Sequence, residues 1–292
     1  MQGGISMALV LENEFCRLEC TTKAGEMKSF YDKTKDQELI YQGNEGWSGS
    51  NPSLFPIVGN TYSTKYTIDG KEYSMKNHGL VRYATLKGEQ KEDSIVLSLD
   101  SDENTLKQYP FNFHYEIEYK LVGKKVEIYY RITNTGDEAM PFSFGLHPGF
   151  ICPQKEGEKF EDYSIDFECE EHAVQFLQDG ACEKPLEYQN VVLSSWQLSR
   201  EDIDKYATLI YKQLKSQYVT LSCKGEGRVK VKIAGYPFLA IWSHPSRSNF
   251  ICIEPWYGHA DFEKVDDFYA REGTILLQPN DTWCCDYSIE AL

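Results

Sequence analysis

Apolar and polar residues alternate with a period of two along most of the 292-residue chain. Between residues 111 and 121 every second side chain is apolar, and the pattern returns between residues 126 and 132, after Gly123 and Lys124. Such alternation predicts half-buried strands, because successive side chains of a strand point to opposite faces of the sheet. The sequence therefore predicts a long antiparallel hairpin with one buried face.

Shorter segments predict many further strands. Asp69 and Gly70 separate two of them and tolerate the positive φ of a tight hairpin turn. The others are expected at residues 207–214, 218–223, 228–235, 238–243, 250–256, 274–279 and 283–292. Ser199 and Asp202 predict the start of a short helix, and the pattern is less regular around residues 160–190. We therefore expect one all-β domain spanning residues 1–292, built from stacked, curved antiparallel sheets.

Composition and charge narrow the range of ligands. The net charge of −15 opposes nucleic-acid binding, which needs clustered cations, whereas the many aromatic residues suit a sheet and a small-molecule cleft. The nine cysteines are irregularly spaced and contain no CxxC pair, so neither a disulfide framework nor a zinc ribbon is indicated. No apolar run is long enough to span a membrane and no signal peptide is evident, so we expect a cytoplasmic protein that does not bind membranes.

Two segments contain polar residues among apolar strand residues. His147 lies in "FSFGLHPGF", where Pro148 and Gly149 predict the end of a strand and place the imidazole at a rigid strand end. Glu254 lies in "FICIEPWYGHAD", where a carboxylate enters an apolar strand at a cost unless it is paired or functional. The neighbouring Trp256 would offer a stacking surface and raise the carboxyl pKa by desolvation. The alternative is that Glu254 ends its strand facing solvent.

His78 and Arg82, in "KNHGLVRYATL", have two interpretations. They are either an ordinary loop histidine with an exposed arginine or a pair of hydrogen-bond donors for ligand hydroxyls. The chain has no GxGxxG, GxxxxGK[ST], GxSxG or HExxH motif, which leaves nucleotide cofactors, α/β-hydrolase chemistry and zinc-protease chemistry without support. A histidine and a glutamate on separate strands point to general acid–base chemistry that needs no metal or other cofactor.

Four segments give the chain a family resemblance. "LFPIVGN", "YTIDGKEYSMKNHGLVR", "FSFGLHPGF" and "FICIEPWYGHAD" occur in an order and spacing that resemble the aldose 1-epimerase (galactose mutarotase-like) family, within it the LacX-like branch. The resemblance covers nearly the whole chain. It implies a β-supersandwich fold and interconversion of the α and β anomers of a hexose.

The resemblance also implies residue roles. By motif, Glu254 matches the base that takes the proton from the anomeric hydroxyl, and His147 matches the acid that protonates the ring oxygen. His78 and Arg82 match hydrogen-bond donors to the sugar, and Asn60 stands where many members have arginine. With Trp256 and Trp242 as aromatic surfaces, these residues form the expected substrate-binding set. Acid and base are expected on opposite sides of the sugar ring.

Several alternatives remain open at this stage. The protein could instead be a hexose-6-phosphate 1-epimerase, or a non-catalytic carbohydrate-binding or sensing protein. A neutral sugar is favoured, because a phosphate dianion needs a cationic pocket and the chain has seven arginines spread along an acidic sequence. We expect a monomer or a homodimer.

Overall fold

A computed structural model of the chain describes residues 8–43, 46–177, 187–245 and 248–292, most of them in antiparallel strands. The strands are β1 (Ala8–Glu12), β2 (Cys16–Thr21), β3 (Met27–Asp32), β4 (Gln37–Glu38), β5 (Ser53–Leu54), β6 (Lys65–Ile68), β7 (Lys71–Ser74), β8 (Lys87–Gln90), β9 (Ser94–Asp100), β10 (Phe113–Val122), β11 (Lys125–Asn134), β12 (Met140–Phe142), β13 (Gly145–Leu146), β14 (Gly149–Ile151), β15 (Tyr163–Leu177), β16 (Glu187–Gln197), β17 (Thr208–Lys212), β18 (Tyr218–Cys223), β19 (Glu226–Lys232), β20 (Phe238–Trp242), β21 (Phe250–Trp256), β22 (Ile275–Leu277) and β23 (Thr282–Ala291). The helices are α1 (Glu103–Gln108) and α2 (Arg200–Tyr206), with short 3-10 turns η1 (Tyr62–Thr64), η2 (Val81–Tyr83), η3 (Phe160–Asp162) and η4 (Phe268–Ala270).

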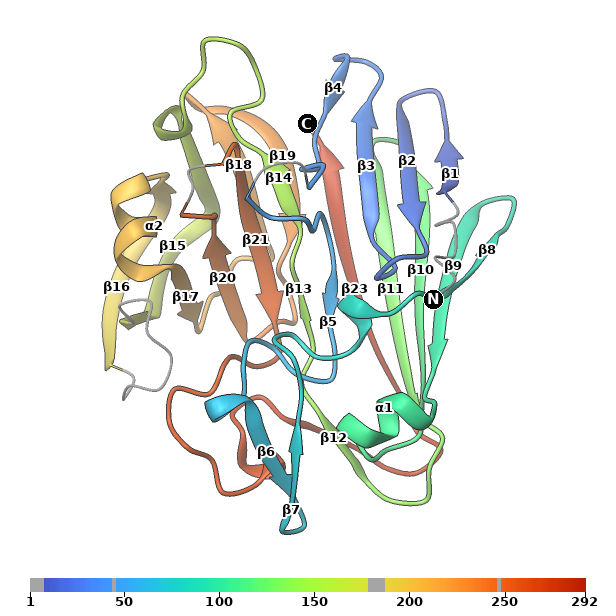
Figure 1. Cartoon of the computed structure of the whole chain (residues 1–292). Coiled ribbons are helices and arrows are strands. Elements are labelled where there is room, and N and C mark those ends of the chain that lie inside the picture. Colours follow the sequence, from blue (N-terminus) through green and yellow to red (C-terminus); the bar gives the residue numbers. More distant parts are fainter. Residues whose placement is uncertain (1–7, 44–45, 178–186, 246–247) are drawn as a thin grey trace.

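Fifteen of these strands form one large sheet. Its order is β5-β13-β21-β20-β17-β15-β18-β19-β23-β11-β10-β9-β8, with β14 also paired to β21 and β16 to β15. Strands β1 to β4 form a second sheet, and β6–β7 and β12–β22 are separate pairs. Figure 1 shows β20 and β21 in one half of the molecule and β9 to β11 in the other, near β1 to β3.

Both halves of the large sheet contribute to one hydrophobic core. Ile128 and Tyr130 of β11 belong to the same buried cluster as Ile241 of β20 and Ile253 of β21. The sheet therefore curves around a shared core, with its two halves stacked as in a sandwich. The prediction of an all-β fold with stacked antiparallel sheets is confirmed.

The local turn and cap signals were informative. Strands β10 and β11 pair from Val122 opposite Lys125, so Gly123 and Lys124 form the predicted two-residue turn. Asp69 and Gly70, between β6 and β7, have φ values of 50° and 77°, the positive values that a type I′ turn requires. Helix α2 begins after Ser199, whose side chain accepts a hydrogen bond from the Asp202 amide at 3.1 Å.

Several elements were not predicted, among them helix α1 and strands β1 to β5, β8, β9, β15 and β16. Helix α1 begins after Asp102, whose carboxylate accepts a hydrogen bond from the Thr105 amide at 2.8 Å in a capping box. Strands β15 and β16 occupy much of the region where the sequence pattern is irregular. Their pairing shifts register between Asp166 and Glu171, which breaks the period of two along β15 and explains why the pattern is hard to recognise.

The eight cysteines among the described residues are all free, and Cys182 lies outside those residues. Neither described α-helix is long and apolar enough to cross a membrane.

Candidate active site

A cavity of about 360 Å³ lies on the face of the large sheet turned away from the main core. Its floor is formed by alternate residues of β17 and β21 and by Trp242 of β20. Its walls are formed by the loops around residues 46–47, 59–60, 77–82 and 260–262. A volume of this size falls within the usual range for small-molecule sites. The lining includes all seven residues that the sequence proposes for the site, namely Asn60, His78, Arg82, His147, Trp242, Glu254 and Trp256.

The pairing of three strands places His147 opposite Glu254. Strands β13 and β14 both pair with β21, and the partners are Gly145 with Trp256 and Gly149 with Cys252. The register is the same on both sides of the gap between β13 and β14. Residue 147 therefore lies directly across from residue 254, where side chains on one face of a sheet meet.

The alternating pattern G-x-H-x-G has a packing reason. Gly145 and Gly149 share the face of His147, and both lie under aromatic rings. A Cβ on Gly145 would lie 2.6 Å from Trp256 Cδ1, and one on Gly149 would lie 2.9 Å from Trp47 Cζ3. Two glycines thus leave room for indole rings on either side of the imidazole.

Strand β13 ends at Leu146, directly before His147, so the expected strand end is confirmed for His147. For Glu254 the expectation is wrong. Strand β21 continues through Glu254 to Trp256, and the chain resumes as β14 directly after Pro148. Proline lacks the N–H that a sheet ladder uses. Pro148 and Pro255 lie on the facing stretches where the ladder between β21 and its neighbour is interrupted, so neither proline ends the sheet.

The two functional groups are close and almost completely buried. His147 Nε2 lies 3.4 Å from Glu254 Oε2, and the residues are 5% and 1% exposed. The contact lacks hydrogen-bond geometry, and neither Glu254 Oε2 nor His147 Nδ1 has a hydrogen-bond partner. Glu254 does not face solvent. The expectation of acid and base on opposite sides of a sugar ring is also wrong, because a 3.4 Å gap admits no ring and neighbouring strands present both groups from the same side.

Burial shifts the pKa values of both groups so that the neutral forms are favoured. Desolvation raises the pKa of the Glu254 carboxyl well above its usual range, against a smaller lowering by the Arg82 charge. Desolvation and, to a smaller extent, the charge of Arg82 together lower the pKa of His147 to about 3. Shifted pKa values of buried groups in a cavity are typical of functional sites.

His78 is held by the backbone in a defined tautomer. It has a φ of 66°, its amide donates to Gly59 O at 2.9 Å, and Gly59 N donates to its Nδ1 at 3.0 Å. Since Nδ1 accepts a hydrogen bond, the ring proton is on Nε2. Burial also lowers the pKa of His78 well below its ordinary value. The residue is therefore a neutral N–H donor at the cavity.

Arg82 lies on the 3-10 turn η2 and is half-buried. Among the described residues it forms no ion pair with a carboxylate, and its guanidinium lies 5.3 Å from the ring of Tyr83. Its charge acts on His78, His147 and Glu254. The guanidinium is thus a cation that faces the acid–base pair without neutralising it.

Aromatic rings surround the imidazole. The ring of Trp47 stacks on His147 with centroids 4.6 Å apart, and Trp242 meets it edge-on at 5.3 Å. Sequence analysis missed Trp47, although its flanking glycines are a signal, since a Cβ on Gly49 would lie 2.5 Å from the indole. Thr208 and Ile210 also line the cavity and were missed, because only the pairing of β17 with β20 brings them there. Phe262 and His244, from loops, line it as well and were missed.

Comparisons with known proteins show the family to which the chain belongs. The family model for aldose 1-epimerase matches residues 7–284. The chain belongs to the aldose 1-epimerase family. It is 31% identical to the chromosomal protein LacX of Lactococcus lactis subsp. lactis, over 98% of this chain and 100% of that protein.

Solved structures show the same fold. A galactose mutarotase related enzyme from Lactobacillus acidophilus superposes with a TM-score of 0.90 at 30% identity, covering 98% of this chain and 97% of that one. A galactose mutarotase-like protein from Lactobacillus casei superposes with a TM-score of 0.86 at 22% identity, covering 98% and 100%. The galactose mutarotase-like fold is confirmed, and the similarities support a carbohydrate isomerase of the epimerase or mutarotase type.

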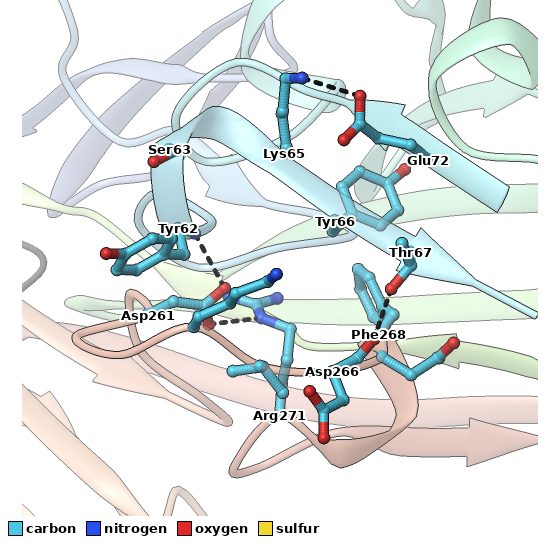
Figure 2. Close-up of a pocket in the computed structure, with 13 residues that line it drawn as sticks. Tyr62, Ser63, Lys65, Tyr66, Thr67, Glu72, Asp261, Asp266, Phe268 and Arg271 are labelled. Carbon is cyan, nitrogen blue, oxygen red and sulfur yellow. Dashed lines mark hydrogen bonds and ion pairs between the residues drawn. The ribbon is translucent and has the colours of Figure 1, made fainter. Parts of the chain in front are cut away.

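In this member of the aldose 1-epimerase family, a buried ion pair of Arg271 and Asp261 lies next to the loops that line the cavity. Arg271 Nε donates to Asp261 Oδ1 at 2.7 Å, and Asp261 Oδ2 accepts from the Tyr62 amide at 3.1 Å. Figure 2 shows both contacts at the edge of a second pocket of about 360 Å³, which shares no lining residue with the first. The Asp261 amide also donates to Asn60 O at 2.9 Å. The ion pair thus fixes the position of Asn60 at the cavity.

Proposed function

We propose that the protein is an aldose 1-epimerase that interconverts the α and β anomers of a neutral hexose. The observation that carries the proposal is the pair of Glu254 and His147, buried and 3.4 Å apart in a cavity of about 360 Å³. Glu254 is the one carboxylate among the described lining residues, so the proton of a bound sugar has one defined acceptor. A site that only bound sugars would have no need of an acid–base pair.

The two groups divide the chemistry of ring opening. Glu254 takes the proton from the anomeric hydroxyl O1 while His147 gives a proton to the ring oxygen O5, and the C1–O5 bond breaks. The aldehyde rotates about the C1–C2 bond. Closure on the other face reverses both transfers, because the carboxyl returns its proton to O1 and the imidazole recovers one from O5. O1 and O5 are bonded to the same carbon, so two groups that lie side by side can reach both.

One proton shared by the pair is enough for this cycle. In the empty cavity, burial favours the neutral carboxyl and the neutral imidazole. A sugar hydroxyl that donates to Glu254 and a ring oxygen that accepts from His147 favour the carboxylate and the imidazolium. The proton then resides on His147, next to O5. The neutral pair is the form that follows ring opening and is ready for closure.

The remaining polar groups orient the sugar. The Nε2–H of His78 and the guanidinium of Arg82 donate to its oxygens, and Asn60 contacts a further hydroxyl. Trp242 and Trp256 present apolar surfaces to the C–H faces of the ring. Fixing the sugar against a rigid sheet removes orientational entropy from the transition state.

The charges of the cavity favour a neutral hexose over a hexose phosphate. Arg82 is the one lysine or arginine among the described residues that line it. A phosphate dianion is usually held by several charge-assisted hydrogen bonds. A single arginine, which already faces the acid–base pair, leaves the phosphate without further cations.

Anomer exchange measured by NMR tests the proposal. Freshly dissolved α-glucose and α-galactose should equilibrate faster with the protein than without it, and their 6-phosphates should be poorer substrates by kcat/KM. Sugar-induced thermal stabilisation without faster exchange would instead identify a binding or sensing protein. Faster exchange of the phosphates alone would identify a hexose-6-phosphate 1-epimerase.

A further inference from the structure

A third potential metal ligand lies beside the acid–base pair. Cys252 precedes Glu254 by two residues on β21, so both side chains point to the same face of the sheet. The thiol is 0% exposed, and its cross-strand partner Gly149 has no side chain to separate it from His147. One ligand atom each from His147, Cys252 and Glu254 lies within 4.8 Å of the other two. Among the described residues, no other His, Cys, Asp and Glu side chains form such a group.

We propose that His147, Cys252 and Glu254 bind a thiophilic divalent cation of the Zn²⁺ or Cd²⁺ class, and that the bound cation blocks the cavity to sugars. The three ligand types are those that zinc takes in sites with an open fourth position. Adjacent ligand atoms around zinc lie roughly 3.3–3.8 Å apart, given bonds of about 2.0–2.3 Å. His147 Nε2 and Glu254 Oε2, at 3.4 Å, already have this spacing.

A second observation points to a ligand at the same place. Glu254 Oε2 has no hydrogen-bond partner although the residue is 1% exposed. An unpartnered buried acceptor is costly, and a cation between the carboxylate and the imidazole would satisfy it.

The charges of the complex also balance. A dication with one thiolate, one carboxylate and one neutral imidazole is neutral overall, so its burial avoids the penalty of an uncompensated charge. The metal deprotonates the thiol, although burial raises the pKa of Cys252 when no metal is bound. Arg82 opposes binding, because its guanidinium acts on the same cavity. We therefore expect the cation to act as a reversible inhibitor and not as a cofactor.

The cation is expected to inhibit the enzyme because metal binding and proton transfer use the same atoms. The cation would occupy the lone pair of His147 and the oxygen of Glu254 that the proposed function uses for proton transfer. Sugar and metal should therefore compete. This consequence rests on the proposed function, whereas cation binding does not, so the two are measured separately.

Cadmium titration of the purified protein tests binding without reference to activity. Wild type should gain a thiolate-to-metal charge-transfer absorption in the ultraviolet, saturating at one equivalent for this site. The Cys252→Ser variant should lose it, and Cys252→Ala serves as a second variant if serine disturbs the strand. The matched control is Cys284→Ser, which removes an exposed thiol on β23 and should leave the band of the Cys252 site intact.

Inhibition is then measured in the anomer-exchange assay. Cadmium or zinc should slow exchange by wild type and by Cys284→Ser, while Cys252→Ser should keep its exchange activity and require at least about tenfold more metal. A band that persists in both Cys252 variants, or none in wild type, would overturn the site. A Cys252-dependent band in a protein without exchange activity would support the site and refute the proposed function.

Discussion

Two cross-strand pairs in the same large sheet have the same arrangement and different surroundings. On the hairpin of β10 and β11, Glu116 lies opposite Arg131, and the side chains form an ion pair of 2.5 Å while remaining 26% and 41% exposed. On β21, Glu254 lies opposite His147, and both are almost completely buried. Water solvates the charges of the first pair, so this ion pair adds little to the stability of the fold. The second pair is desolvated, which shifts the pKa values of both groups toward the neutral forms.

The burial patterns of the two regions explain this difference. Strand β11 alternates between partly exposed and buried residues, so its polar side chains reach water. All seven residues of β21 are buried, because one face packs in the main core and the other lies under the cavity walls. A carboxylate on such a strand lowers the stability of the fold, so its presence suggests a function. The comparison can be tested by exchanging one feature at a time.

The largest difference in activity is expected between the two variants that remove the carboxylate of one pair each. Glu254→Gln keeps the shape but removes the base, so anomer exchange should slow by about 10²–10⁴-fold. Glu116→Gln should leave exchange unchanged, since its carboxylate lies on the exposed face of the hairpin. Both variants should retain the wild-type circular dichroism spectrum. Equal activity of the two variants would show that the buried pair has no special role.

A smaller effect is expected from the two arginines. Arg82→Gln removes a cation that orients the sugar and favours the Glu254 carboxylate, so kcat/KM should fall by about 10- to 100-fold. Arg131→Gln, on the hairpin, should change kcat/KM little and stability by less than about 1 kcal/mol. Steady-state kinetics and urea denaturation measure the two quantities. Unchanged kinetics in Arg82→Gln would remove this residue from the site.

The smallest effect concerns stability and its dependence on pH. Unfolded histidine binds a proton near pH 6.5, whereas folded His147 does so only near pH 3. Between these values the unfolded state carries more protons, so His147 makes the fold less stable as the pH falls. Relative to wild type, His147→Gln should gain up to about 1.4 kcal/mol per pH unit on acidification in this window. If the free energies of unfolding of wild type and His147→Gln differed by the same amount at pH 7 and at pH 5, the buried neutral imidazole would be contradicted.

The same contrast explains which parts of the fold could be predicted. The hairpin was predictable because each strand shows its own alternation and the turn residues are local. Helix α2 was predictable from Ser199, and α1 was missed although Asp102 and Thr105 form an equivalent cap. Strand β15 was missed because its register shift interrupts the alternation.

For the candidate site, the sequence predicted which residues belong to it but not how they are arranged. Motifs and the family resemblance pointed to Glu254, His147, His78 and Arg82, and the cavity contains all of them. Their geometry depends on pairing between strands that are about a hundred residues apart in sequence, and no local signal encodes that register. For this reason the strand-end position of Glu254 and the opposed acid and base were wrong. Thr208 was missed for the same reason, because only its pairing with Trp242 brings it to the cavity.

A double-mutant cycle on anomer exchange tests the central claim most directly. The rates of wild type, Glu254→Gln, His147→Gln and the double variant are measured by NMR on the same hexose. If the two residues share one proton and act as a unit, the double variant should be about as slow as the slower single variant. Losses that multiply, or a wild type that accelerates no aldose, would contradict the account.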